Sequence, residues 1–332
     1  MPADLLEFEE PVGVLLKEIE ALSMLPRTPE RERSIETLRS RADEIRTEIF
    51  ANLTAWQRVL VARHPNRPNT LDYAANATVV TVDLGAEAAT GTGGIAQILS
   101  VLGSAGADTL IGPGAATTWQ VTGANAGVVG AVSFSGIEHL TGGAAQDTFV
   151  LADTGSVSGA LAGGLGEDVL IGPDAASTWD ITGADAGQVN GSAFSSLENL
   201  LGGAAADAFI LGAAASVSGT VGGGSGIDRV RGADKRNRWR ITGAGSAALD
   251  GVSLTGVEQV DGGSDEYELV GPDGDATWSI TGPGAGTVGG LAFSGMEDLT
   301  GAAANADTFV VEAGGSLSGV VEGGALNWGN GE

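Results

Sequence analysis

The sequence predicts a mainly β protein, a solenoid of stacked coils preceded by an α-helical hairpin. Three observations carry this prediction: a sharp change of composition near residue 74, a helical period of apolar residues before it, and a 60-residue repeat after it. Only one of the 55 glycines, Gly13, precedes residue 74. We therefore expect a helical segment over residues 1–73, a degenerate first coil or linker over 74–102, and solenoid repeats over 103–332.

The balance of basic and acidic residues also changes near residue 74. Most basic residues precede residue 74, so nearly all of the formal net charge of −26 belongs to the repeats. Such an acidic surface repels nucleic acid, and no nucleic-acid partner is expected. The absence of cysteine excludes disulfides and thiolate chemistry. The sequence shows no N-terminal signal peptide and no apolar run of the roughly 20 residues that a membrane helix needs.

Apolar residues three and four positions apart predict two amphipathic helices that pack as a hairpin. Pro29 suits the first position of the second helix, with Thr28 as its cap. Thr54 and Gln57 have the spacing of a capping box, which predicts a third, short helix ending before Pro65. The two apolar stripes are Val12, Leu15, Ile19 and Leu22, and then Ile35, Leu38, Ala42, Ile45 and Ile49.

The repeats recur with a 60-residue period, as the series Trp119, Trp179, Trp239 shows. Each repeat divides into a 21-residue unit, an 18-residue unit and a second 21-residue unit. The third unit is missing between Asp261 and Gly262, where the tryptophan spacing drops to 39. A clean loss of one unit indicates that it forms one structural turn, which predicts a parallel β-helix or β-roll of about 20 residues per coil.

Two repeat units carry the pattern Gly-Gly-x-Gly-x-Asp, at residues 163–168 and 223–228. Through this pattern residues 75–332 resemble the glycine-rich β-solenoid repeats of RTX-like bacterial surface proteins. The resemblance implies calcium held by stacked turns, at Asp147 with Asp168 and at Asp207 with Asp228. The alternative, which we favour, is that each aspartate accepts backbone hydrogen bonds at its own turn. No other cofactor is expected.

Six basic residues crowd one 21-residue unit. They suit either an anionic partner or the acidic side chains of neighbouring coils, and internal neutralisation is the favoured interpretation. The six are Arg229, Arg231, Lys235, Arg236, Arg238 and Arg240.

Residues 5–73 resemble the N-terminal helical region of the bacterial acetyl-CoA carboxylase carboxyltransferase α subunit. The resemblance rests on the run from Trp56-Gln57 through Ala62-Arg63-His64-Pro65, Arg67-Pro68 and Thr70-Leu71-Asp72-Tyr73. The family places a crotonase-like catalytic core directly after this run, whereas the sequence changes character at Ala74. We therefore expect no catalytic residues. Trp56 is expected in a core and His64, between Arg63 and Arg67, at a turn.

These observations predict a non-catalytic structural or adhesive scaffold. The alternative is a carboxyltransferase-derived protein whose helical segment, residues 5–73, docks to a carboxylase subunit. A third interpretation is a join of two unrelated coding segments. The two resemblances point to different locations, the cytoplasm for the helical segment and the cell surface for the repeats. Open strand edges at the end of a solenoid also predict end-to-end self-association.

Overall fold

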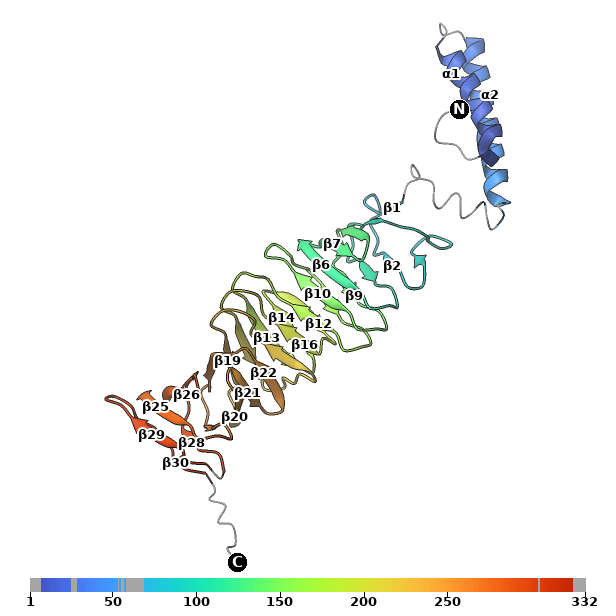
Figure 1. The fold of residues 1–332 in the computed structure, drawn as a ribbon. Helices are drawn as coiled ribbons and strands as arrows, with labels where there is room; N and C mark the ends of the chain where they lie inside the picture. The colour runs from blue at the N-terminus through green and yellow to red at the C-terminus, as the bar shows by residue number, and fades with distance from the viewer. Residues whose placement is uncertain are drawn as a thin grey trace, which may run out of the picture. The chain divides into compact units, whose positions relative to one another are not determined.

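The computed structural model describes residues 7–24, 29–52, 54, 57, 69–303 and 305–324. The chain forms two compact units, which divide between Asn69 and Thr70. The first unit is helical and the second is built of β-strands (Figure 1). The division lies slightly before the predicted boundary at residue 74, and residues 74–102 belong to the β unit, where they supply some of its first strands.

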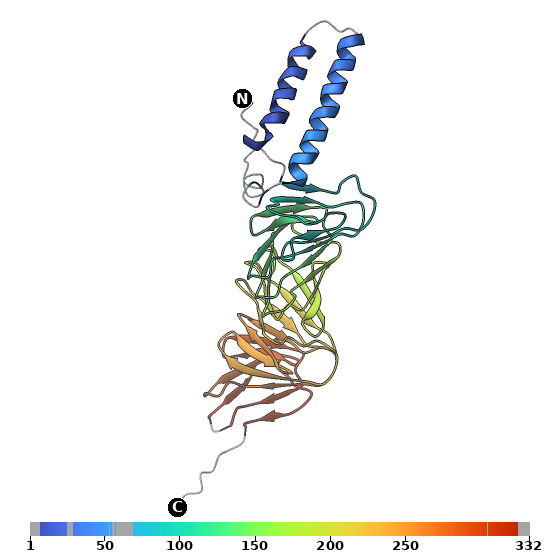
Figure 2. The ribbon, with the colours of Figure 1, turned by 90° about the vertical axis from the view of Figure 1, so that its right-hand side faces the viewer.

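The first unit is the predicted helical hairpin. A short 3₁₀ turn, Glu7–Glu9, leads into α1 (Glu10–Ser23), and α2 (Pro29–Ala51) lies beside it (Figure 2). Pro29 opens α2 as predicted, while Thr28 lies outside the described residues. Val12 and Ala42 are buried, and the other residues of the two apolar stripes are half-buried. The capping box forms, because Thr54 Oγ1 accepts from Gln57 N at 3.2 Å and Gln57 Oε1 accepts from Thr54 N at 2.9 Å.

The second unit consists of two 15-stranded sheets. Sheet A contains β1 (Thr70–Asp72), β4 (Ser100–Leu102), β6 (Thr118–Gly123), β7 (Ala126–Val129), β8 (Val132–Ser135), β10 (Thr148–Leu151), β12 (Val169–Ile171), β16 (Asn199–Leu201), β18 (Thr220–Gly222), β20 (Asn237–Gly243), β21 (Ser246–Leu249), β22 (Val252–Thr255), β24 (Tyr267–Val270), β28 (Asp298–Thr300) and β30 (Val321–Glu322).

Sheet B has the same number of strands. It contains β2 (Thr81–Asp83), β3 (Ala88–Ala89), β5 (Thr109–Ile111), β9 (His139–Thr141), β11 (Ala160–Ala162), β13 (Thr178–Gly183), β14 (Ala186–Val189), β15 (Ser192–Ser195), β17 (Ala208–Leu211), β19 (Arg229–Arg231), β23 (Gln259–Asp261), β25 (Thr277–Gly282), β26 (Ala285–Val288), β27 (Leu291–Ser294) and β29 (Thr308–Val311).

The chain winds between the two sheets as a β-solenoid, the predicted fold (Figure 1). Its turns have two main lengths. Val169 in β12 pairs with Thr148 in β10, one 21-residue turn earlier. Thr148 in turn pairs with Thr118 in β6 across a 30-residue turn. The longer turns contain the 18-residue repeat unit, which is not a turn of its own: β7 and β8 double back antiparallel beside β6 in the same sheet.

Successive 60-residue repeats lie on opposite sheets. Between β10 and β17 the chain crosses from one sheet to the other five times, through β11, β12, β13 to β15, and β16. Because five is odd, Trp119 lies in sheet A, Trp179 in sheet B and Trp239 in sheet A again. The missing 21-residue unit removes one whole turn, as predicted, and leaves this alternation intact at Trp278 in sheet B.

One hydrophobic core runs between the sheets from Val82 to Leu299. Its largest members are the tryptophans, all fully buried. Trp179 stacks on Phe209 of the next 30-residue turn, with ring centroids 5.3 Å apart, and meets Phe194 edge to face. Period-2 alternation of short strands therefore places large side chains inside the solenoid, and stacking of turns buries faces that no single turn could bury.

Candidate functional site

Buried carboxylates form the most distinctive polar feature of the solenoid. Five aspartates are at most 2% exposed, and each stands immediately before a strand. Parallel stacking leaves the backbone N–H at this corner without a strand partner, and burial of an unpaired N–H is costly. Each carboxylate satisfies such an N–H on a neighbouring turn. The five are Asp108, Asp147, Asp168, Asp207 and Asp228.

The contacts continue from turn to turn, and we call each continuous series a carboxylate ladder. In the ladder beside sheet A, Glu198 Oε2 accepts from Asp168 N at 2.7 Å. Asp168 Oδ1 accepts from Asp147 N at 2.6 Å, and Asp147 Oδ1 accepts from Thr117 N at 2.8 Å. Four consecutive turns are thus joined at one corner by side-chain to backbone hydrogen bonds.

An equivalent ladder lies beside sheet B, one repeat further along the chain. Glu258 accepts from Asp228 N at 2.8 Å, Asp228 from Asp207 N at 2.7 Å, and Asp207 from Ser177 N at 2.7 Å. A shorter ladder near the start of the solenoid joins Glu138 to Asp108 N and Asp108 to Val80 N, both at 2.8 Å. The ladders follow the alternation of the repeats between the sheets.

The structure brings each predicted aspartate pair to one corner, Asp147 with Asp168 and Asp207 with Asp228. Their Oδ1 atoms already accept backbone N–H groups. Among the residues that the structure describes, no three or more His, Cys, Asp or Glu side chains are placed to hold a metal ion. This geometry favours the hydrogen-bonding interpretation, and calcium binding stays a prediction.

The glutamates of the ladders have no role in the sequence-based prediction, although Glu138, Glu198 and Glu258 recur with the 60-residue period. Each lies directly before a strand and reaches back over a 30-residue turn to a backbone N–H, as Asp147 and Asp207 also do. The periodic glutamate directly before an apolar strand is the signal that identifies this role.

Burial raises the pKa of three ladder aspartates, which favours their protonated form. Desolvation is the largest cause and raises the pKa of Asp168, Asp207 and Asp228 above the usual value for aspartate. The backbone N–H bonds oppose that rise. The neighbouring charges of Glu198 and Asp147 add to it at Asp168, as those of Asp207 and Glu258 do at Asp228.

Five of the six crowded basic residues pair with acids, in line with the favoured interpretation. Arg229 contacts Asp261 on the neighbouring strand β23, Arg238 Nε lies 3.1 Å from Glu268, and Arg240 lies 2.8 Å from Asp273. Arg231 pairs with Asp234 and Lys235 with Asp250, at 3.1 and 3.3 Å. These pairs gather near the missing repeat unit.

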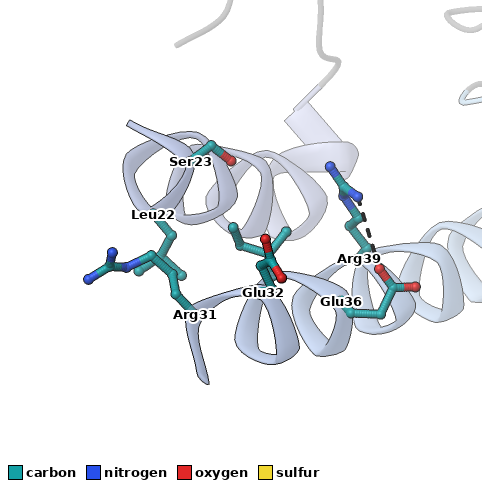
Figure 3. Close-up of a pocket in the computed structure, with 7 residues that line it drawn as sticks. Leu22, Ser23, Arg31, Glu32, Glu36 and Arg39 are labelled. Carbon is teal, nitrogen blue, oxygen red and sulfur yellow. Dashed lines mark ion pairs between the residues drawn. The ribbon is translucent and has the colours of Figure 1, made fainter. Parts of the chain in front are cut away.

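A groove opens in the helical unit where α1 ends and α2 begins. A cavity of about 310 Å³ is lined by Leu22 and Ser23 of α1 and by Arg31, Glu32, Ile35, Glu36 and Arg39 of α2 (Figure 3). Arg39 and Glu36 face each other on one wall, 4.0 Å apart. The groove combines apolar side chains with a rim of both charges, which suits a protein segment better than a small anion.

The structure describes only part of the motif that carries the carboxyltransferase resemblance, which includes Gln57 in the capping box and Thr70–Asp72 in β1. Trp56, Arg63, His64 and Arg67 all lie outside the described residues. The expectation that Trp56 enters a core and that His64 lies at a turn therefore stays a prediction.

Comparison with known proteins supports the resemblance of the N-terminal region. A family model described as acetyl co-enzyme A carboxylase carboxyltransferase-like matches residues 5–93. The match extends past Tyr73, so it crosses the division between the two units and includes β2 and β3.

Curated relatives of this region are acetyl-coenzyme A carboxylase carboxyl transferase alpha subunits. That of Phenylobacterium zucineum is 49% identical over 78 residues, which cover 23% of this chain and 24% of the relative. Those of Geobacillus thermodenitrificans and Yersinia enterocolitica are 46% identical over 70 residues and 38% over 81, covering 20% and 23% of this chain and 22% and 25% of the relatives. The chain thus spans about a quarter of their length.

Comparison with solved structures gives no further relative, because no solved structure matches the chain. Within the described part of the chain, no helix combines the length and the apolar character needed to cross a bilayer.

Proposed function

We propose that the chain is a non-catalytic structural scaffold, in which a rigid acidic solenoid presents the carboxyltransferase-like helical segment. One observation carries the proposal: both sheets and the core continue without interruption from the first turn to the last described one. A hinge requires a place where few contacts cross between neighbouring parts. Each pair of neighbouring turns here shares strand pairing, and the carboxylate ladders add further bonds at the corners.

The chemistry of the outward surface supports the same proposal. The buried carboxylates are occupied by backbone N–H groups, and the basic residues of the solenoid are largely paired with acids. What faces solvent is an acidic surface with scattered apolar side chains, which suits display or adhesion. The resemblance to the repeats of RTX-like surface proteins points in the same direction.

Limited proteolysis of the full chain tests the scaffold. We expect a fragment beginning near Thr70 to resist digestion as one block, with cleavage confined to the N-terminal residues and the last few residues. Early cleavage inside residues 103–303 would show a flexible joint and overturn the rigid scaffold. Carboxyl transfer from malonyl-CoA by the full chain, alone or mixed with a purified carboxyltransferase β subunit, would overturn its non-catalytic character.

A second candidate function is docking of the helical segment to a carboxylase subunit, which rests on the match over residues 5–93. Helix α1 leaves Val14 at 59% and Leu16 at 37% exposed on the hairpin surface. Exposed apolar side chains on a small helical unit are suited to a protein interface. The groove beside Leu22 lies at the C-terminal end of the same helix and is a second candidate contact for a partner.

Binding of the full chain to a purified carboxyltransferase β subunit tests the docking function. We expect a Val14→Ser, Leu16→Ser double variant to weaken binding at least tenfold while the helix signal in circular dichroism is kept. The matched control is Lys17→Gln on the exposed surface of the same helix. Equal binding of the wild-type chain and the double variant, or no binding at all, would contradict docking through α1.

The predicted end-to-end association of solenoids stays a prediction. Val311 on β29 and Val320 before β30 are 62% and 56% exposed. Sedimentation of the full chain and of a Val311→Lys, Val320→Lys variant tests it. A concentration-dependent dimer that the variant lacks is the expected result, and identical sedimentation of the two proteins would contradict it.

A further inference from the structure

The ladders contain two kinds of corner, which differ in one carboxylate oxygen. At the corner of residues 142–147, Gly143 N donates to Asp147 Oδ2 at 2.6 Å. At the corner of residues 202–207, Gly203 N donates to Asp207 Oδ2 at 2.8 Å. In these corners each carboxylate oxygen accepts a backbone N–H, which stabilises the ionised form.

The two Gly-Gly-x-Gly-x-Asp corners lack that second bond. Asp168 Oδ2 and Asp228 Oδ2 are inaccessible to solvent and have no hydrogen-bond partner among the described residues. Both side chains are fully buried. The corresponding donors would be Gly164 N and Gly224 N, but these glycines adopt φ of +107° and +98°.

The sequence explains why the two corners differ. Gly166 and Gly226, the third glycines of the pattern, have φ of +137° and +128°, which an alanine rarely adopts. The other kind of corner has Ala145 and Ala205 at the same place. The third glycine therefore permits a corner in which Leu165 N or Ser225 N donates to a carbonyl of the preceding turn, each at 3.1 Å. The aspartate then receives only one backbone N–H.

We propose that Asp168 and Asp228 each bind one proton in the folded chain, under conditions in which an exposed aspartate is ionised. A buried carboxylate oxygen without a donor is costly as an anion, and a proton removes the charge. The atom is too enclosed for a hydrated metal ion without opening of the corner, whereas a proton can reach it through small fluctuations of the structure.

The charged groups around each site reinforce proton binding. Asp168 lies between Asp147 of the preceding turn and Glu198 of the next, and both are negative neighbours. Burial and these two neighbours raise the pKa of Asp168. Among these three side chains, Asp168 is the one with a buried carboxylate oxygen that has no hydrogen-bond donor, so it is the favoured place for the proton.

Asp228 has the same surroundings in sheet B. Burial raises its pKa, and the charges of the flanking Asp207 and Glu258 add to that rise. The adjacent Arg229 belongs to β19, is half-exposed, and pairs with Asp261. The two sites are thus independent copies of one arrangement, one repeat apart on opposite sheets.

The sign of the effect on stability follows from linkage. Because the pKa is raised in the folded state, the folded chain binds more protons than the unfolded chain. The stabilisation by these protons is complete below the unfolded pKa and is lost as the pH rises through the folded pKa. Asparagine mimics the neutral acid, so an Asp168→Asn, Asp228→Asn variant should lose this pH dependence.

The experiment compares thermal unfolding of the full wild-type chain with that of the double asparagine variant, from about pH 5 to about pH 9. We expect similar melting temperatures at the acid end and a variant that melts several degrees above the wild type at the alkaline end. The matched control is Asp147→Asn, Asp207→Asn. It places an amide against backbone donors and should melt below the wild type throughout.

Infrared spectroscopy gives a second readout that needs no change in stability. The wild-type chain near neutral pH should show the carbonyl stretch of a buried carboxylic acid, which the Asp168→Asn, Asp228→Asn variant lacks and which single variants halve. Absence of the band in the wild type, or parallel pH profiles for the two proteins, would overturn the proposal. So would stabilisation by millimolar calcium at alkaline pH that the double variant abolishes, because the unpartnered oxygens would then bind a metal.

Discussion

Tyr267 of β24 lies opposite Asn237 of β20. In two other repeats an aspartate occupies the position of Tyr267, with Asp147 opposite Thr117 and Asp207 opposite Ser177. Tyr267 belongs to the turn at which the 21-residue repeat unit is missing. The phenol of Tyr267 donates to Ala233 O at 2.5 Å, and Asn237 Nδ2 donates to the same oxygen at 2.8 Å. At this turn the bonds of Tyr267 and Asn237 to one carbonyl oxygen therefore take the place of the bond between a ladder carboxylate and a backbone N–H.

The pair should show energetic coupling. Tyr267→Asp places a carboxylate beside an asparagine whose own side chain is bonded elsewhere, and Asn237→Thr removes a donor to Ala233 O. Neighbouring residues of one network show coupling of about 0.5–3 kcal/mol. We expect the double variant Tyr267→Asp, Asn237→Thr to restore a ladder contact and to lose less stability in urea unfolding than the sum of the two single variants. If the loss of unfolding free energy in the double variant equalled the sum of the losses in the single variants, the inferred replacement of the carboxylate contact would be contradicted.

Two phenylalanines stack on core tryptophans in the same way but differ in burial, so their contributions to stability can be compared. Phe209 is fully buried and stacks on Trp179, whereas Phe309 stacks on Trp278 at 5.1 Å but is only half-buried in the last described turns. Phe209→Ala should cost about 3–5 kcal/mol of unfolding free energy, the range for deleting a buried phenylalanine. Phe309→Ala should cost clearly less, and equal losses in urea unfolding would contradict the assigned burial.

The sequence predicts the solenoid but not the path of its longer turns. The missing unit between Asp261 and Gly262 identifies a 21-residue turn, because only a whole turn can be lost without breaking the register. Short alternating strands look the same whether the chain crosses to the other sheet or doubles back. Asn190-Gly191 and Asp250-Gly251 do carry the signal of a two-residue hairpin, with φ of +48° and +86° in the first pair.

The same limit applies to the ladders. The pairing of Asp147 with Asp168 follows from their 21-residue spacing, because that spacing is one short turn. Contacts over a 30-residue turn, such as that of Glu198 with Asp168 N, become predictable only when the doubled-back strands are known. The unpartnered oxygen of Asp168 depends on the backbone conformations of Gly164 and Gly166, which the glycines permit but which only the structure establishes.

The ion pairs near the missing unit should contribute unequally. Arg229 pairs with Asp261, whose side chain is only 16% exposed, while Arg240 pairs with Asp273, which is 81% exposed. Exposed pairs contribute about 0–1 kcal/mol and are screened by salt. We expect Arg240→Gln to leave urea unfolding unchanged and Arg229→Gln to destabilise the chain measurably at low salt. The reverse order would show that accessibility does not govern these pairs.

Alanine at Gly166 tests whether the third glycine of the Gly-Gly-x-Gly-x-Asp corner is needed for its backbone conformation. A Cβ there would lie 2.8 Å from the backbone of Ala145 in the preceding turn, at a φ of +137°. Strain of this kind costs about 1–3 kcal/mol, so Gly166→Ala should lower the urea midpoint. Gly123→Ala is the matched control, because its nearest contact would be Ala126 Cβ at 3.8 Å, and it should be neutral or slightly stabilising. If Gly166→Ala were also neutral, the corner would have adopted the conformation of residues 142–147, and the infrared band of protonated Asp168 should then disappear with it.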